Sequence, residues 1–365
     1  MSKPLVLVTG ATGKTGAAVV AQLREKGWPV RAVVRSRDER SARLDRLGAE
    51  TVVADLFDPD HLLDALRGES RAYYCPPFHP YMIEGAAAFA VAAREARLES
   101  IVGLSQWLAS PAHPSLATRQ LWLADRLFAT IPGVAHTIVR PGFFADNYLR
   151  LIGFAAHLGV LPSLTGDSRN APPSNEDIAR VAVAALTDPG AHAGRAYRPT
   201  GPALLSTRDM ADILSNVLGR KVRRLEMPMW MFLKAARMQG VDPFEMSGFR
   251  YYVEDHKHGA FEFGAPTNDV LEVTGRQPEE FGTIARRYAA SLGKRRGGGA
   301  QLRAWADFLR TPLSPGFDLE RFEREQGFPV PPEPRLALAD VRWTRERAAR
   351  VARPSVLDPV RPDAA

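Results

Sequence analysis

Cysteine is almost absent from this chain, because Cys75 stands alone among 365 residues. A single cysteine can form neither an intramolecular disulfide nor a cysteine-rich metal site. The histidines are scattered, and the close pair His256 and His258 is typical of a solvated loop, so we expect no bound metal.

Long apolar runs are lacking as well. No uninterrupted apolar stretch approaches the roughly 20 residues that a membrane-spanning helix needs. An apolar strand begins at Leu5, which leaves no room for a signal peptide before it. These absences together predict a cytoplasmic protein without a membrane partner.

The excess of basic residues is small, with 48 Lys and Arg against 41 Asp and Glu and a formal net charge of +7. No compact basic cluster interleaved with aromatic side chains is present, so we do not expect direct nucleic-acid binding. An arginine-rich surface with a site for an anionic cofactor accounts for this charge. The length allows one large domain or two ordinary ones.

A glycine-rich turn is the most informative stretch that the chain does contain. The apolar run 5–8 is typical of a buried parallel strand and residues 17–23 of an amphipathic helix, so Gly10, Gly13 and Gly16 lie between them. Gly10 permits a tight turn, Gly13 lets a pyrophosphate approach the backbone, and Gly16 lets the helix pack closely. The N-terminus of the helix offers N–H groups to the phosphates.

The end of the same stretch, Gly13-Lys14-Thr15, also fits the end of the phosphate-binding loop found in nucleoside triphosphatases. That pattern requires its first glycine at the position of Val8, which is β-branched and still inside the strand. We therefore favour dinucleotide binding over triphosphate binding or a purely structural turn. Lys14 and Thr15, at the start of the helix, belong to the predicted cofactor site.

Strands and helices alternate after this turn with a period of ~25–30 residues, which is typical of a doubly wound parallel sheet of the α/β class. Further strands are expected over 30–34, 51–54, 72–75, 101–104 and 136–139, with helices over 60–66, 82–96, 118–128 and 175–186 and one that follows Ser206-Thr207 and ends at Leu218. Asn175 is the expected cap of the fourth of these helices. The sequence thus predicts a Rossmann-type sheet with a smaller, mainly helical C-terminal substrate region.

Basic residues follow the second strand, where a dinucleotide fold meets the adenosine ribose. Arg35 and Arg37 stand there, and no acidic residue precedes Asp38. An arginine at this place accommodates the 2′-phosphate of NADP, whereas an acidic residue would bind the 2′-hydroxyl of NAD. We predict NADP(H) in preference to NAD(H), with Asp55 after the third strand near the adenine.

Several motifs, taken in order, resemble the NmrA-like family of atypical short-chain dehydrogenase/reductase proteins. They are Thr9-Gly10-Ala11-Thr12-Gly13, Arg35, Ser105-Gln106, Arg140-Pro141-Gly142-Phe143-Phe144 with Asn147, Asp177-Ile178-Ala179, residues 197–202 and residues 274–278. The resemblance spans roughly residues 4–290. It implies that the cofactor is carried by Gly10, Thr12, Gly13, Arg35 and Asp55.

The catalytic pair that is usual in short-chain dehydrogenases is missing. Those enzymes use Tyr-x-x-x-Lys, in which the tyrosine gives a proton to the carbonyl as the hydride arrives. None of the 8 tyrosines has a lysine four residues later, and no lysine stands between Lys26 and Lys221. Arg119 lies near the place where many NmrA-like reductases carry a lysine; it can hold a ribose or a phosphate but is no general acid near neutral pH. The remaining catalytic candidates are Ser105 and His113, each of which a structural role would also explain.

The region after residue 142 is rich in aromatic residues and methionine. By the resemblance, Phe143, Phe144 and Tyr148 line a substrate cleft that faces Trp107, and ordinary packing is the alternative for each of them. The part 227–252 fits a lid over an apolar substrate, the core of a small domain or the surface of a homodimer.

Three segments follow from these patterns: a cofactor-binding core over 1–142, a substrate region over 143–292 that returns some segments to the core, and an extension over 293–365. Residues 294–299 are typical of a linker. Short helices are expected over 301–309 and 318–326. The extension is either a partly ordered tail or an arm that wraps a partner subunit.

Two classes of function stay open. The first is an NADPH-dependent reductase of a small apolar carbonyl or quinone-type acceptor. The second is a non-catalytic redox sensor that binds the dinucleotide and regulates a protein partner. The missing Tyr-x-x-x-Lys pair favours the sensor, and the aromatic second region favours the enzyme, which is the interpretation we prefer.

Overall fold

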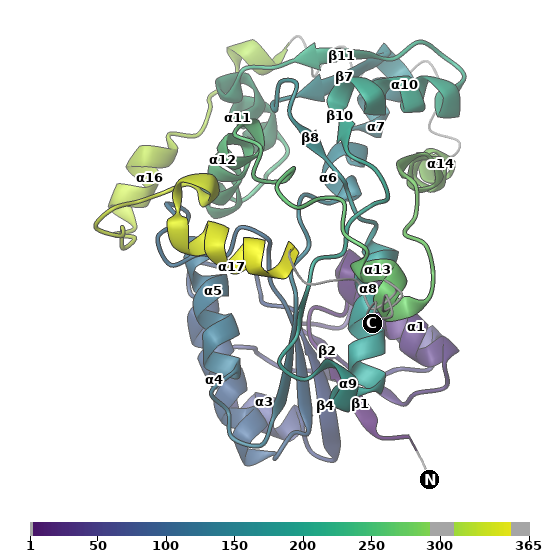
Figure 1. Cartoon of the computed structure of the whole chain (residues 1–365), viewed down its shortest axis with the longest axis vertical. Helices are drawn as coiled ribbons and strands as arrows, with labels where there is room; N and C mark the ends of the chain where they lie inside the picture. The colour runs from purple at the N-terminus through teal and green to yellow at the C-terminus, as the bar shows by residue number, and fades with distance from the viewer. Residues whose placement is uncertain (1–2, 293–309, 352–365) are drawn as a thin grey trace, which may run out of the picture.

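The computed structural model describes residues 3–292 and 310–351 of the chain. Its centre is a seven-stranded sheet in the order β3-β2-β1-β4-β5-β6-β9, in which every neighbouring pair is parallel (Figure 1). The strands are β1 (Leu5–Val8), β2 (Val30–Val34), β3 (Glu50–Val53), β4 (Glu69–Tyr74), β5 (Ser100–Leu104), β6 (Ala135–Val139) and β9 (Ala196–Tyr197). The predicted Rossmann-type α/β fold is confirmed.

Helices cover both faces of this sheet, because its strands are apolar on both sides. One face packs against α1 (Lys14–Glu25), α2 (Glu39–Arg46) and α8 (Asn175–Thr187). The other face packs against α3 (Pro59–Ala65), α4 (Met82–Glu95) and α5 (Leu116–Phe128). Figure 1 shows the two groups on opposite sides of the sheet.

The chain changes direction between β1 and β4, which are hydrogen-bonded neighbours although two strands separate them in sequence. This is the topological switch point of a doubly wound sheet, and ligands of such sheets bind outside the carboxyl ends of the strands there. The glycine-rich turn after β1 and the segments after β4 and β5 all lie at this edge. The fold therefore places the glycine-rich turn at the edge of the sheet where ligands of this fold bind.

One predicted helix cap is wrong. The side chain of Ser174 accepts a hydrogen bond from the backbone N–H of Asp177, so Ser174 is the N-cap of α8. Asn175 lies inside the helix, where its side-chain oxygen accepts a hydrogen bond from the Thr15 hydroxyl at 2.8 Å. Asn175 thus joins α8 to the glycine-rich turn instead of capping its own helix.

The substrate region forms a second layer beyond the carboxyl edge of the sheet (Figure 1). Its helices and strands are α6 (Ala145–Leu149), α7 (Ile152–Leu158), β7 (Val160–Ser163), β8 (Arg169–Asn170), α9 (Pro189–His192), β10 (Leu205–Ser206), α10 (Thr207–Leu218), β11 (Arg223–Glu226), α11 (Met229–Met238), α12 (Pro243–Lys257), α13 (Asp269–Thr274) and α14 (Phe281–Leu292). Of these, α9 and α13 pack beside α8 and so return to the sheet. The remaining elements enclose a separate apolar core that contains Phe143, Tyr148 and Phe261.

The C-terminal segment folds back onto its own chain. It contains the 3₁₀ turns η2 (Thr311–Leu313) and η3 (Ala337–Ala339) and the helices α16 (Leu319–Glu325) and α17 (Val341–Val351). The yellow helix α17 lies between the sheet and the helices of the substrate region (Figure 1). The helix expected over 318–326 is confirmed, whereas the linker 294–299 and the helix expected over 301–309 lie outside the described residues.

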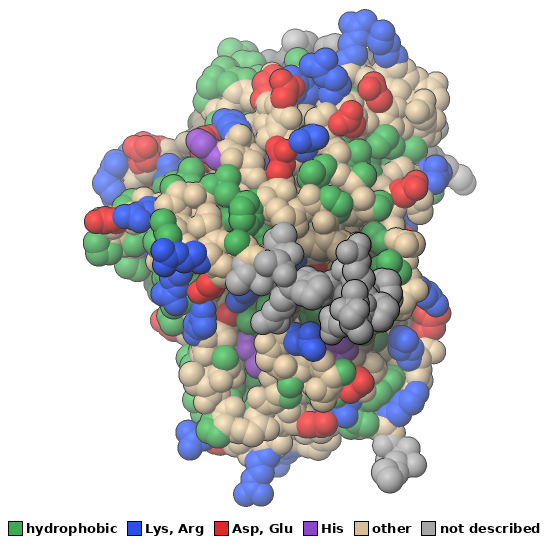
Figure 2. Space-filling model, in the orientation of Figure 1, with side chains coloured by type: hydrophobic (Ala, Val, Ile, Leu, Met, Phe, Trp, Pro, Cys, Tyr) green, Lys and Arg blue, Asp and Glu red, His purple; other side chains and the backbone are tan. Residues whose placement is uncertain are grey.

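Within the described ranges, no helix is long and apolar enough to cross a membrane. The same ranges contain no group of three or more His, Cys, Asp or Glu side chains that could hold a metal ion. On the face shown in Figure 2, Lys and Arg side chains are dispersed and alternate with acidic ones, without one continuous basic patch.

Candidate functional site

The glycine-rich turn has the geometry that a pyrophosphate needs. Gly10 has a φ of +61°, and a Cβ there would lie 2.8 Å from the Cβ of Cys75 at the end of β4. A Cβ on Gly16 would lie only 2.2 Å from the carbonyl oxygen of Gly10, so the helix approaches the turn more closely than any side chain allows. Gly13 precedes α1 and provides no side-chain cap, which leaves the first N–H groups of the helix open to an anion.

Lys14 and Thr15 use their side chains to join the turn to other segments. The Lys14 ammonium forms an ion pair with Asp146 of α6, and the Tyr288 hydroxyl of α14 donates to the same carboxylate. Thr15 bonds Asn175, as described above. The turn is thereby tied to the substrate region through Lys14 and to α8 through Thr15. The Thr12 side chain is half-buried. A direct role of these three side chains in cofactor binding stays a prediction.

Thr9 is a residue of the turn that the sequence analysis did not assign. Its hydroxyl accepts a hydrogen bond from the backbone N–H of Cys75 at 2.8 Å and donates to the Cys75 carbonyl at 3.1 Å. The side chain thus ties the end of β1 to the end of β4 across the switch point. The Cys75 thiol lies against Gly10, and burial raises its pKa to about 12, so it stays protonated.

Three charged residues stand at the adenosine end of the expected cofactor path. Arg35 follows β2, is exposed, and makes no hydrogen bond or ion pair with another described residue. Its neighbour Arg37 instead donates to the hydroxyl and carbonyl of Thr51 at 3.1 Å each. Asp55 is exposed after β3, and one of its oxygens accepts a hydrogen bond from the N–H of Phe57 at 3.0 Å. Arg35 is therefore the better placed of the two arginines to receive a 2′-phosphate.

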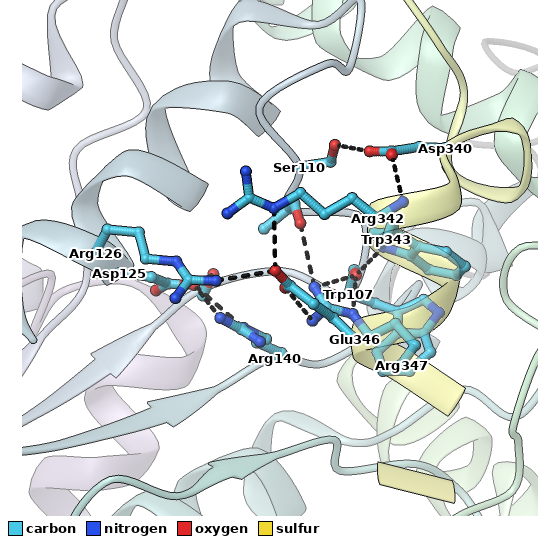
Figure 3. A network of polar contacts seen from close by, with 12 residues as sticks. Trp107, Ser110, Asp125, Arg126, Arg140, Asp340, Arg342, Trp343, Glu346 and Arg347 are labelled. Carbon is cyan, nitrogen blue, oxygen red and sulfur yellow. Dashed lines mark hydrogen bonds and ion pairs between the residues drawn. The ribbon is translucent and has the colours of Figure 1, made fainter. Parts of the chain in front are cut away.

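Ser105 begins a buried polar network at the carboxyl end of β5. Its hydroxyl donates to the carboxylate of Asp125 in α5 at 2.9 Å. The guanidinium of Arg140, which follows β6, donates to the same oxygen through Nε at 3.1 Å and Nη2 at 2.9 Å (Figure 3). These contacts give Ser105 a structural role, because they link β5, α5 and β6. A catalytic role of Ser105 stays a prediction.

Trp107 lies in the protein core and is 1% exposed. Its indole N–H donates to the Ala260 carbonyl at 2.8 Å, and the Arg198 guanidinium lies 3.6 Å from the ring centroid. Helix α17 covers its other side, where Trp343 Nε1 and Arg347 Nε donate to the Trp107 carbonyl at 3.0 and 3.3 Å (Figure 3). The C-terminal segment therefore fixes the stretch that follows β5.

His113 is fully buried, and both of its ring nitrogens are engaged. Nδ1 accepts a hydrogen bond from the backbone N–H of Ser115 at 3.0 Å, and Nε2 lies 2.7 Å from a carboxylate oxygen of Asp255. The other Asp255 oxygen accepts from the backbone N–H of Ala337 in the C-terminal segment. This geometry favours a structural role for His113, which connects α5 to α12 and to the C-terminal segment.

Arg119 is also engaged with the backbone. Its Nη1 donates to the carbonyls of His113 and Pro114 at 2.6 and 2.8 Å, and its Nη2 donates to the carbonyl of Pro329. Burial lowers the pKa of this guanidinium. A cofactor would have to compete with these contacts for Arg119. The structure therefore does not itself support the prediction that Arg119 holds the cofactor.

An apolar pocket of about 60 Å³ lies in the substrate region, next to the carboxyl end of β6. Of the predicted cleft residues, Phe143 and Tyr148 line it, whereas Trp107 and Phe144 are not among the lining side chains. Phe144 instead packs at the border of the sheet core. The remaining apolar wall includes Leu151, Met227, Phe232, Met246, Phe249 and Val253. The Met-rich part of the chain thus contributes to a pocket wall, and its role as a lid over a substrate stays a prediction.

One side of this pocket is polar. The hydroxyls of Ser163 and Thr207 lie 3.1 Å apart, and the buried hydroxyl of Thr165 has no hydrogen-bond partner among the described residues. A buried hydroxyl without a partner is costly, and this one belongs to the lining of a pocket. The pocket can therefore offer a hydrogen bond to one polar atom of an otherwise apolar ligand.

His256 was expected in a solvated loop, and this prediction is wrong. It lies near the end of α12 and is 1% exposed. Its Nε2 is 2.7 Å from the Tyr148 hydroxyl and its Nδ1 is 2.7 Å from the Ser168 hydroxyl. Burial lowers the pKa of His256 to about 4 and raises the pKa of Tyr148, so both are neutral near pH 7. An available signal was the spacing of Tyr252, Val253 and His256, which gives α12 a buried face.

A family model described as NAD(P)H-binding matches residues 10–189. An NAD(P)H azoreductase from Xenophilus azovorans is 32% identical over 297 residues, which cover 79% of this chain and 99% of the azoreductase. The chain belongs to this NAD(P)H-binding family. The NAD(P)-binding family predicted from the sequence is thereby confirmed, and a solved structure of an NmrA mutant shares the fold.

Two further relatives extend this comparison. A (4-alkanoyl-5-oxo-2,5-dihydrofuran-3-yl)methyl phosphate reductase from Streptomyces griseus is 34% identical over 280 residues, covering 76% of this chain and 95% of that reductase. The solved structure of an NADPH-dependent quinone oxidoreductase from Escherichia coli, in complex with NADPH, has the same fold with a TM-score of 0.67 at 21% identity. That match covers 79% of this chain and all of the oxidoreductase, so about a fifth of this chain has no counterpart there.

Proposed function

We propose that the protein is an NADPH-dependent reductase of a small apolar acceptor of the quinone, azo or carbonyl type. The observation that carries this proposal is the apolar pocket with one polar wall, next to the edge of the sheet where the glycine-rich turn lies. A dinucleotide along the carboxyl edge would reach from Arg35 to the segment after β6. The related azoreductase and furan reductase, both matched over nearly their whole length, support a reductase.

The residues proposed to hold the cofactor follow from the same geometry. The pyrophosphate would lie on the backbone of Gly10, Thr12 and Gly13 and on the open N–H groups of α1. Arg35 would bind the 2′-phosphate of NADPH, and Asp55 would face the adenine. The bound nicotinamide would supply a hydride, and the acceptor would lie in the pocket between Phe143 and the Met-rich wall.

A pair of substitutions on the Met-rich part tests the pocket. Met227→Trp places a larger side chain in the pocket wall, whereas Met238→Trp changes an exposed methionine at the end of α11 outside the lining. We expect Met227→Trp to raise KM for a quinone or azo acceptor at least tenfold and to leave the NADPH dissociation constant within about twofold. Met238→Trp should change neither value. Equal KM values in the two variants would show that the acceptor binds elsewhere.

The alternative function, a redox sensor for a protein partner, makes a different prediction in the same assay. A sensor would bind NADPH and NADP⁺ with very different affinities and would consume no NADPH with any acceptor of these classes. Turnover of even one quinone or azo dye that depends on the pocket would exclude a purely non-catalytic role.

A further inference from the structure

We propose that Tyr148 is the proton donor of the reduction and that His256 and Ser168 return a proton to it from the surface. This inference rests on the proposed reductase function. Hydride transfer to a neutral quinone, azo or carbonyl group leaves a negative charge on oxygen or nitrogen, so a proton must also be supplied. The usual Tyr-x-x-x-Lys pair is missing from the sequence.

Tyr148 meets the first requirement of a proton donor, which is its place at the pocket. It lies in α6, just after the carboxyl end of β6, and is one of the pocket-lining residues. Its ring packs against Phe143, with 5.0 Å between the ring centroids, and against Phe281 at 6.4 Å. These contacts fix the position of the phenol beside the apolar wall, where an acceptor would lie.

The second requirement is a route by which the tyrosine regains its proton. Tyr148 Oη, His256 and Ser168 form a continuous chain with two links of 2.7 Å. Ser168 is half-buried, and its hydroxyl also lies 2.6 Å from the Thr165 carbonyl. The chain therefore leads from the buried phenol toward the surface. Asn170 adds a weaker contact, with its amide nitrogen 3.4 Å from Tyr148 Oη.

The same atoms satisfy two tautomers of a neutral His256. In the first, Tyr148 donates to Nε2, Nδ1–H donates to Ser168, and Ser168 donates to Thr165. In the second, Ser168 donates to Nδ1, Nε2–H donates to Tyr148 Oη, and the phenol proton is free to be donated to an acceptor. In the first tautomer the phenol proton of Tyr148 is bonded to His256, and in the second tautomer it is available to an acceptor. Because His256 can bond in both directions, it connects Ser168 with Tyr148 without becoming charged.

The proposed step conserves atoms and charge. A bound reduced nicotinamide would supply the hydride that forms the new bond to the acceptor, and it would itself be oxidised. The Tyr148 O–H bond breaks, and its proton forms an O–H or N–H bond on the acceptor. The tyrosinate takes the proton from Nε2 of His256, Nδ1 takes the proton of Ser168, and Ser168 takes a proton from water. The water leaves as hydroxide, so each turnover takes up one proton from the solvent. Thr165 is a pocket-lining residue whose buried hydroxyl has no hydrogen-bond partner among the described residues, and it would hold the polar atom of the acceptor.

The test compares two acceptors that differ in their need for a proton. A quinone needs a hydride and a proton, whereas a cationic triphenylmethane dye becomes neutral when it takes a hydride alone. In Tyr148→Phe we expect quinone reduction to fall at least ~100-fold, as for loss of a general acid, and dye reduction to stay within about threefold. The NADPH dissociation constant should stay within about twofold.

Tyr252→Phe is the matched control. Tyr252 lies on the same helix as His256, and its ring centroid is 6.0 Å from that of Phe143, but its hydroxyl takes no part in the chain to Ser168. We expect this variant to reduce both acceptors like the wild type. If Tyr148→Phe retains quinone reduction, or loses quinone and dye reduction alike, Tyr148 is not the proton donor.

The tautomer of His256 gives a readout that needs neither cofactor nor turnover. Nitrogen-15 NMR shifts of its ring distinguish Nδ1–H from Nε2–H. Because a buried N–H keeps its partner, Tyr148→Phe should favour Nδ1–H and Ser168→Ala should favour Nε2–H. If the His256 ring keeps one tautomer in both variants, the proposed proton transfer from Ser168 through His256 to Tyr148 is wrong. If the wild type oxidises NADPH with neither acceptor, the proposed function fails, and this measurement still tests the relay by itself.

Discussion

Trp343 in α17 anchors the C-terminal segment, and replacing it by alanine tests how this segment is held. The indole is 1% exposed, lies 5.4 Å from the Trp107 ring in an edge-to-face arrangement, and donates to the Trp107 carbonyl at 3.0 Å. Truncating a buried tryptophan to alanine costs about 3–5 kcal/mol. Arg347 still donates to the same carbonyl, so the change leaves this acceptor satisfied. We therefore expect a cost near the lower end, about 3 kcal/mol.

Native-state hydrogen exchange of the α17 amides measures this cost directly. A loss of about 3 kcal/mol corresponds to roughly 150-fold faster exchange, at a factor of ten for every 1.4 kcal/mol. Val341→Ala, which changes an exposed side chain at the start of the same helix, is the control and should alter exchange less than threefold. Unchanged protection of α17 in Trp343→Ala would show that the packing on Trp107 does not hold the segment.

Three further predictions concern the cofactor site and the sheet. Gly13→Val should abolish dinucleotide binding, because its side chain blocks the pyrophosphate; unchanged NADPH affinity by calorimetry would contradict the site. This variant should lower the melting temperature less than Gly16→Ala, because a Cβ on residue 16 would lie 2.2 Å from a carbonyl oxygen. Arg35→Ala should weaken NADPH binding by roughly 1.5–3 kcal/mol and spare NADH, because only NADPH brings a 2′-phosphate; equal losses would place that phosphate elsewhere. Burial raises the pKa of Glu69 to about 8. The folded protein then holds a proton that the unfolded chain releases above about pH 4.5, so stability should fall as pH rises from 4.5 to 8, and Glu69→Gln should flatten this dependence in urea titrations.

Much of the fold could be predicted from the sequence, because the buried strands and the helices between them have strong local patterns. The strand over 30–34 agrees with the structure at both ends, and the helix predicted to end at Leu218 does end there. The position of Gly10 at a positive φ also follows from local sequence. Such features depend on residues that are near one another in the chain.

The candidate site was harder to predict, because its contacts join distant segments. The partner of His113 is Asp255, and the partners of His256 are Tyr148 and Ser168. No local pattern specifies these pairs, so the sequence left the role of His113 open between catalysis and structure and assigned His256 to a loop. The placement of the C-terminal segment could likewise not be predicted, because its packing on Trp107 involves residues more than 200 positions away.

Calorimetric titration with NADPH, NADP⁺, NADH and NAD⁺, followed by NADPH oxidation against a panel of quinones and azo dyes, decides whether the protein is an NADPH-dependent reductase. We expect tighter binding of NADPH than of NADH and turnover of at least one acceptor, with oxidised cofactor and reduced acceptor formed in equal amounts. Binding of neither NADPH nor NADH, or binding without turnover of any acceptor, would contradict this function.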